Sequence, residues 1–238
     1  MKSKILAAAV LLSPLWLGLP SKAQSPDDVI RLLETKQCEG CDLSGANLFN
    51  VDLRGANLFD ADLSGANLHD ANLAGADIGG ANLAGANLFK ADLSGSNLRE
   101  ANFSNANLTY ANLGQTDLTG AVFENAIVYE TNLSESMLSD SNFSNANLRG
   151  AFLFRSNLKN ANFSSATLYN ADLRGSNLNG ANFSNANLNF AKLIETNINL
   201  ANFDGASLEG ANLRDTALEL PVCVLTDVVN CLKPAPLP

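Results

Sequence analysis

The chain has 238 residues and a formal net charge of -9, with charged residues at 16% and aromatic residues at 7%. Ala, Asn, Leu and Ser dominate, so the sequence cannot build an ordinary globular core from large side chains. The acidic balance argues against direct binding of nucleic acid, which needs a cationic face to displace counterions.

Residues 1–23 have the pattern of a cleaved secretory signal peptide. Lys2 and Lys4 form a basic start, the stretch 5–19 is apolar, and small residues precede an expected cut after Ala23. An uncleaved anchor is the alternative, but the apolar stretch is short for a bilayer span and a proline interrupts it. We therefore expect an exported mature chain without a membrane span, in an oxidising compartment.

Residues 24–40 are expected to form an N-terminal helical cap. The sequence Ser25-Pro26-Asp27-Asp28 provides an N-cap, a proline at the first helical position and acids in the first turn. The apolar residues Val29, Ile30, Leu32 and Leu33 follow. This pattern predicts a short helix near 26–36 that lies over the first coil of the next segment.

Residues 41–220 form an uninterrupted five-residue repeat. Every fifth residue from Cys41 is small, and a large apolar residue follows two positions later, as in Ala46-Asn47-Leu48. A period of five fits neither an α-helix nor a plain strand. It fits a square coil in which each unit places one small and one large residue inward and then turns a corner.

A second period of twenty indicates how the coil closes. Phe replaces Leu at the large position at regular intervals of twenty residues: Phe103, Phe123, Phe143, Phe163, Phe183 and Phe203. Four units therefore complete one turn, and the segment should form about nine coils. At a strand spacing of about 4.8 Å, these coils give a rod roughly 43 Å long.

The repeat resembles the pentapeptide-repeat family over residues 41–220, and its register never slips. The resemblance implies an all-β solenoid, a right-handed quadrilateral β-helix. The leader, the entry Cys38-Glu39-Gly40-Cys41 and the richness in Asn and Asp are similar to cyanobacterial members exported to the periplasm or thylakoid lumen. One branch of the family mimics DNA and binds topoisomerases, but that branch is cytosolic and usually carries a loop insertion.

The segment 221–238 is expected to be a C-terminal cap and tail, and all four cysteines lie in the two caps: Cys38, Cys41, Cys223 and Cys231. An even count in an exported protein favours disulfides. Bridged Cα atoms lie within about 7 Å of each other, which the length of the rod forbids between the caps. We therefore predict Cys38–Cys41 and Cys223–Cys231.

Other chemistry at the cysteines is disfavoured. A redox-active Cys38/Cys41 pair is the alternative, but no Lys, Arg or His directly flanks the pair in the sequence to stabilise a thiolate. A four-cysteine zinc site fails the same distance test. Haem attachment fails because Asp42 follows Cys41. The single histidine, His69, lies at an outward position, so we predict no catalytic residue, no cofactor and no metal site.

The twenty-residue spacing also distinguishes the outer faces. One face carries an aromatic series, for which the candidate interaction residues are Phe49, Phe89, Tyr110, Tyr129, Tyr169 and Phe190. These side chains either stack between coils to stabilise the rod or bind a partner. A second candidate is mid-rod, where apolar residues replace the usual Asn or Asp: Val122, Ile127, Met137 and Phe152.

The sequence leaves two functions from different classes. The first is a non-catalytic exported scaffold that binds an unknown protein partner, or itself, through a rigid face. The second is an acidic DNA mimic that inhibits a topoisomerase. Mimicry needs acids regularly spaced along one face, whereas the acids here are scattered and mixed with basic residues, among them Lys90, Arg99 and Arg149.

Overall fold

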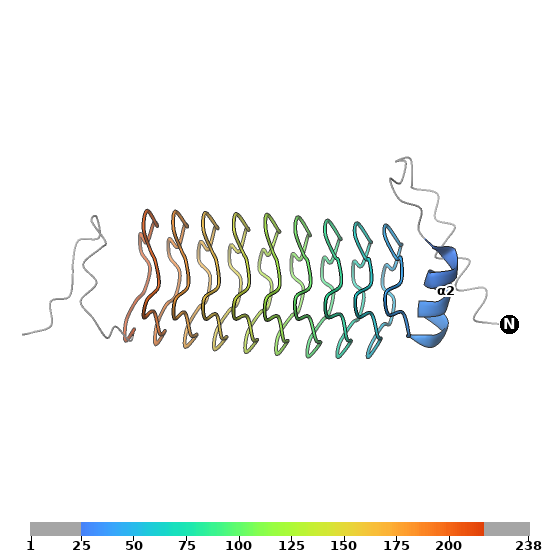
Figure 1. The fold of residues 1–238 in the computed structure, drawn as a ribbon. Coiled ribbons are helices and arrows are strands. Elements are labelled where there is room, and N and C mark those ends of the chain that lie inside the picture. The colour runs from blue at the N-terminus through green and yellow to red at the C-terminus, as the bar shows by residue number, and fades with distance from the viewer. Residues whose placement is uncertain (1–24, 217–238) are drawn as a thin grey trace, which may run out of the picture.

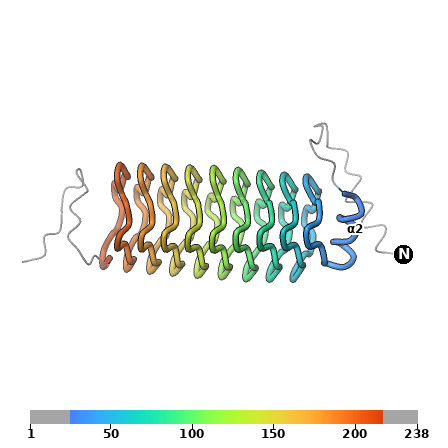
Figure 2. The backbone as a smooth tube through the Cα atoms, in the orientation of Figure 1, coloured from blue at the N-terminus to red at the C-terminus, as the bar shows by residue number. Residues whose placement is uncertain are grey.

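The computed structural model describes residues 25–216, which form one rod of stacked coils with a single helix across its first end (Figure 1). The backbone trace in Figure 2 shows the coils following one another along one axis, from the blue N-terminal end to the orange C-terminal end. The expected signal peptide, the C-terminal cap and the Cys223–Cys231 pair lie outside the described residues. Within them, no helix is long and apolar enough to cross a bilayer.

Each coil repeats after twenty residues, as the sequence predicts. Every fifth residue from Gln37 to Lys192 forms a parallel bridge with the residue twenty positions later, for example Asp42 with Asp62. The amide of Leu43 donates to the carbonyl of Asp62 at 2.8 Å, and the amide of Asp62 donates to the carbonyl of Cys41 at 2.9 Å. The chain therefore forms the predicted right-handed quadrilateral β-helix, in which each side contributes one bridged residue per coil.

The interior is filled by the small and large positions of the repeat. From Leu43 to Leu193 the large positions are fully buried. The predicted phenylalanine column is stacked ring on ring, with centroids 4.4 Å apart for Phe123 and Phe143 and 5.0 Å apart for Phe143 and Phe163. Each coil thus buries its apolar side chains against the coils above and below it.

The last residue of each unit turns the corner in the left-handed backbone region. Gly85 has φ +67° and Asn105 has φ +59°. Glycine adopts this region without steric cost, and Asn tolerates it better than most residues. The requirement explains why these two residue types recur at that place in the repeat.

The Asn or Asp before each large residue joins neighbouring coils. Asn162 donates through Nδ2 to Oδ1 of Asn142 at 3.0 Å, and its own Oδ1 accepts from Nδ2 of Asn182 at 3.0 Å. The same Oδ1 accepts from the backbone amide of Ser164 at 3.1 Å. One side chain therefore links three coils and also satisfies a backbone donor at the turn.

One inner column carries hydroxyl groups, which the sequence interpretation missed. Its members are buried and share a spacing of twenty: Ser96, Thr116, Ser136, Ser156, Ser176 and Thr196. Thr116 donates to the carbonyl of Leu113 at 2.7 Å, and Ser136 donates to the same carbonyl at 2.8 Å. Because each hydroxyl finds a carbonyl of the turn, a polar side chain replaces alanine there without an unsatisfied donor.

The N-terminal helix is present as α2, Pro26–Thr35, and it covers the first coil (Figure 1). The Ser25 side chain accepts from the amide of Asp28 at 3.3 Å. Lys36 ends the helix in the left-handed region, where its amide donates to the carbonyl of Leu32. Val29 and Leu32 are fully buried against the rod. This contact shields the first coil edge, which would otherwise expose unpaired backbone groups.

The predicted disulfide between Cys38 and Cys41 is formed, with Cα atoms 5.2 Å apart. Arg31 of α2 lies over it, with Nη2 2.9 Å from Sγ of Cys41. Arg31 also donates to the carbonyls of Gln37 at 3.1 Å and Glu39 at 3.2 Å. No Lys, Arg or His directly flanks the two cysteines in the sequence, but the helix brings the Arg31 guanidinium next to them. This side chain fastens α2 to the loop that the disulfide closes.

Candidate functional site

The coil repeat brings the aromatic series onto one face. Phe49, Phe89, Tyr129 and Tyr169 each occupy the first outward position after a large inner residue in the same column, whereas Tyr110 and Phe190 occupy the corner position beside it. His69 and Arg149 occupy that column in two further coils, and Thr109 and Asn189 occupy it in the coils of Tyr110 and Phe190. We call these eight residues the aromatic stripe: Phe49, His69, Phe89, Tyr110, Tyr129, Arg149, Tyr169 and Phe190.

The first five members of the aromatic stripe touch in sequence. The ring of His69 stacks between those of Phe49 and Phe89, with centroids 5.2 and 5.0 Å away. Tyr110 then turns nearly perpendicular to both neighbours, at 85° to Phe89 and 81° to Tyr129, with centroids 5.7 and 5.9 Å away. Stacked and edge-to-face contacts are both favourable arrangements of aromatic rings.

The last three members continue the aromatic stripe by a cation–π contact. The Arg149 guanidinium carbon lies 4.7 Å from the ring centroid of Tyr169, which in turn lies 5.4 Å from that of Phe190. A second cation borders the other half, because Nζ of Lys90 lies 5.3 Å from the centroid of Phe89. The surface is therefore aromatic along its centre and carries charges at defined places.

Stacking does not bury these side chains completely. Phe49 remains 51% exposed, Tyr110 46% and Phe190 47%. Each therefore has surface that a partner could cover, in addition to the surface it covers on its neighbours. Ile127, 44% exposed, lies on the same side of the same coil as Tyr129 and interrupts the Asn and Asp contacts there. The repeat spacing could have assigned Ile127 to this face from the sequence.

The mid-rod apolar residues do not form one patch. Val122, Ile127, Met137 and Phe152 belong to four different columns of bridged residues, and thus to four sides of the rod. A partner with one flat surface cannot cover all of them. The hypothesis of a second mid-rod site therefore loses its geometric basis.

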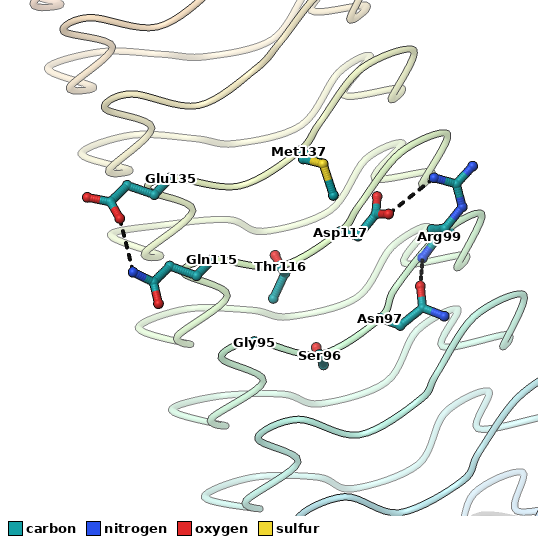
Figure 3. A pocket seen from close by; sticks show the side chains of 9 residues that line it. All are labelled: Gly95, Ser96, Asn97, Arg99, Gln115, Thr116, Asp117, Glu135 and Met137. Atoms are coloured by element: carbon teal, nitrogen blue, oxygen red, sulfur yellow. Dashed lines mark hydrogen bonds and ion pairs between the residues drawn. The ribbon is translucent and has the colours of Figure 1, made fainter.

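A shallow hollow of ≈ 560 Å³ lies on the side of the rod that carries Met137 (Figure 3). Its polar side chains pair with one another: Nε2 of Gln115 donates to Glu135 at 3.0 Å, and Nη1 of Arg99 donates to Asp117 at 3.1 Å. Figure 3 shows these two pairs on opposite sides of the hollow. Because these groups satisfy each other, they are poorly disposed to bind a ligand.

The described neighbours of His69 are Asp70, Phe49 and Phe89. Its Nδ1 lies 3.0 Å from a carboxylate oxygen of Asp70, and its ring is held between two phenylalanines. Within residues 25–216, no group of three or more His, Cys, Asp or Glu side chains could hold a metal ion. The stacking on Phe49 and Phe89 makes the histidine a member of the aromatic stripe.

Arginine side chains neutralise acids on other faces of the rod. Arg54 contacts Asp52 at 2.8 Å, and its hydrogen bond lowers the pKa of that carboxyl. Burial raises the pKa of Asp172, but hydrogen bonds from Arg174, whose Nη2 lies 2.6 Å away, outweigh burial and lower the pKa overall. On the aromatic face, the Glu130 carboxylate raises the pKa of Tyr129.

Comparison with known proteins identifies the repeat. The family model described as pentapeptide repeats matches in 8 copies, whose segments run without a gap from residue 37 to residue 219. A comparison with curated protein sequences finds no match.

Solved structures show the same fold. HetL, a pentapeptide repeat protein involved in heterocyst differentiation regulation in the cyanobacterium Nostoc sp. strain PCC 7120, is 25% identical with a TM-score of 0.51; the match covers 82% of this chain and 94% of HetL. A trypsin-treated variant of QnrB1, a plasmid-mediated fluoroquinolone resistance protein, is 22% identical with a TM-score of 0.66; the match covers 74% of this chain and 88% of QnrB1. Both comparisons agree with the coil geometry.

Proposed function

Because the chain belongs to the pentapeptide repeat family, whose fold offers rigid faces rather than an enclosed site, we propose that it is a non-catalytic, exported interaction protein. It binds a protein partner through the aromatic stripe. The observation that carries this proposal is the line of neighbouring aromatic rings on one face, among which Phe49, Tyr110 and Phe190 are about half exposed. Contiguous exposed aromatic surface is typical of binding interfaces.

Two observations support export. The sequence of residues 1–23 has the pattern of a leader, and Cys38 is bonded to Cys41. Disulfides persist in oxidising compartments and are rare in the cytosol. The periplasm and the thylakoid lumen are the two compartments that we propose.

The DNA-mimic alternative has less support. The likeness to QnrB1 at 22% identity concerns the fold alone. A mimic must present unpaired acids at regular intervals, whereas Asp52, Asp117 and Asp172 are each paired with an arginine. Cell fractionation separates the two functions, because a cytosolic chain would favour the mimic.

The experiment that tests binding is a crosslinking capture from the exported fraction. The bait is the chain from Gln24 onward, compared with a stripe variant that carries Phe49→Ser, Tyr110→Ser and Phe190→Ser. A matched control carries Phe59→Ser, Met137→Ser and Phe152→Ser, which are 40%, 49% and 44% exposed on other faces. We expect a protein that the wild type and the control capture and the stripe variant does not. Equal capture by all three proteins would show that the stripe residues stabilise the rod and do not bind the partner.

A further inference from the structure

We propose that the Cys38–Cys41 pair is a redox-active site that exchanges electrons with a dithiol, and not a permanent crosslink. The site lies at the end of the rod that α2 covers, so this inference does not involve the aromatic stripe. The observations that carry it are the groups that α2 places against the two sulfur atoms. These are the Arg31 guanidinium at Cys41 and the carbonyl oxygen of Asp28 at Cys38.

The contact between Arg31 and Cys41 favours the reduced pair. Nη2 of Arg31 lies 2.9 Å from Sγ of Cys41. A disulfide sulfur is neutral and only a weak acceptor, whereas a thiolate is negatively charged and is stabilised by a neighbouring guanidinium. The same contact therefore becomes a charge-assisted hydrogen bond once the disulfide is reduced and Cys41 is a thiolate. The fold thus supplies the neighbouring cation that a redox-active cysteine needs.

The contact at Cys38 has the same preference. Sγ of Cys38 lies 3.3 Å from the carbonyl oxygen of Asp28. A disulfide has no proton to donate to this oxygen, whereas a thiol can donate its S–H. The surroundings of the two sulfur atoms therefore match a thiol at Cys38 and a thiolate at Cys41. Stabilisation of the reduced form makes a disulfide easier to reduce.

Other groups hold the carboxylates that would oppose a thiolate. The carboxylates that flank the pair along the chain, contact it through α2 or lie on the bridged coil are Glu39, Asp42, Asp28 and Asp62. Asp42 accepts from the Ser44 hydroxyl at 2.6 Å, Asp62 accepts from the Ser64 amide at 3.1 Å, and Glu39 is exposed.

The Asp28 carboxylate is divided between two other groups. It accepts from the amide of Asp42 at 3.1 Å and lies 3.9 Å from Nη1 of Arg31. The contact of Arg31 with the Cys41 sulfur is the shorter of its two contacts, by about an ångström. Because Coulomb energies fall with distance, the guanidinium has the largest effect on the charge of Cys41.

The exchange is a two-electron reaction whose atoms balance. The two thiols of the dithiol form a new S–S bond, and the S–S bond between Cys38 and Cys41 breaks, by way of a mixed disulfide. Of the two protons that the dithiol gives up, one stays on Cys38 and the other goes to solvent. Cys41 is left as a thiolate beside Arg31. Reduction of the pair therefore releases one proton.

The helix α2 controls access to the pair. Cys38 is fully buried and Cys41 is 2% exposed, so a dithiol reaches them only when α2 moves. A helix of 10 residues is marginal without tertiary packing, and α2 fully buries Val29 and Leu32. Segments near a chain end with few buried side chains open at a lower free energy than the core. We therefore expect exchange to need the lifting of α2 but not the unfolding of the coils.

The test is the equilibrium of the full mature chain with reduced and oxidised dithiothreitol, which is the dithiol probe. Alkylation followed by peptide mass spectrometry reports Cys38 and Cys41 separately from Cys223 and Cys231. Because reduction releases a proton when Cys41 becomes a thiolate, the equilibrium constant for reduction should rise about tenfold between about pH 7 and about pH 8. A pair reduced to two neutral thiols would show little change over this range.

Three variants test the role of the guanidinium charge. Arg31→Gln keeps a hydrogen-bonding side chain but removes the charge, so its equilibrium constant should be about tenfold lower at about pH 8 and should change little with pH. Arg31→Lys keeps the charge and should keep the pH dependence. Arg155→Gln, which removes an exposed arginine far along the rod, is the control and should behave as the wild type.

The outcomes decide the proposal without reference to the aromatic stripe. It is overturned if the equilibrium of the wild type does not depend on pH, or if Arg31→Gln has the same equilibrium constant as the wild type. It is also overturned if Arg31→Lys behaves like Arg31→Gln, because charge would then not be the cause. Reduction that occurs only when the coils unfold, as followed by circular dichroism, would likewise identify a permanent crosslink.

Discussion

Phe143 should be among the most costly residues of the rod to truncate. It is fully buried and stacks on both sides, against Phe123 at 4.4 Å and Phe163 at 5.0 Å. Phe143→Ala leaves a cavity between two coils and should lower the free energy of unfolding by about 3–5 kcal/mol. Phe143→Leu loses the two ring contacts but fills most of the space, so it should cost about 1–3 kcal/mol.

Equilibrium urea unfolding followed by circular dichroism measures both losses. The first coils support the milder effect of leucine, because Leu43, Leu63 and Leu83 occupy the same column there and are fully buried. Phe152→Ala, at a 44% exposed position, is the control and should change stability little. The reasoning about the column would be refuted if Phe143→Ala cost no more than Phe152→Ala.

Three further predictions follow from side chains between coils. Val122→Asn should stabilise the rod by about 1 kcal/mol in thermal or urea unfolding, because it extends the amide contacts between Asn102 and Asn142; a loss of stability would contradict this. Gly180→Ala should destabilise the rod more than Gly85→Ala, although both glycines have positive φ. The new Cβ at position 180 would lie 2.6 Å from Oδ1 of Asn160, whereas the new Cβ at position 85 would have no atom within 4 Å. Equal losses of stability in unfolding experiments would argue against this contact. Arg174→Gln should lower the stability of the rod at neutral pH, because it removes the charge paired with buried Asp172. The folded-state pKa of Asp172 is lowered, so this stabilisation is present above the ordinary carboxyl pKa and is lost as pH falls through the lowered value; an unfolding series in which the effect grows toward acid pH would contradict it.

The sequence predicts the coil because the repeat is local and regular. A small residue and a large one at fixed places in every unit determine what faces inward, and the phenylalanines at intervals of twenty identify the number of units in a turn. The same rule places Phe49 and Tyr169 on one face. It could also have found the hydroxyl column of Ser96 and Thr116, since both lie on the twenty-residue spacing.

Contacts between the helix and the coil could not be read in this way. Arg31 reaches the Cys41 sulfur because α2 packs across the first coil, ten residues away along the chain. No periodicity connects these two positions. The orientation of Tyr110 relative to its neighbours is similarly a result of packing, because its corner backbone has φ +61° and directs the ring differently from those in the next column.

The five positions of each repeat unit have different roles in the fold. Three of the five positions are used by the fold: the small residue and the large residue fill the interior, and the Asn or Asp between them links coils, as Asn162 does. The remaining two point outward: the first tolerates many residue types, whereas the corner position favours Gly and Asn. Aromatic residues at those two positions are not required by the coil, because Ser44, Ser64 and Ser104 occupy the equivalent place on a neighbouring face. Their accumulation on one face is therefore an addition to what the coil requires, and it supports the proposed interface.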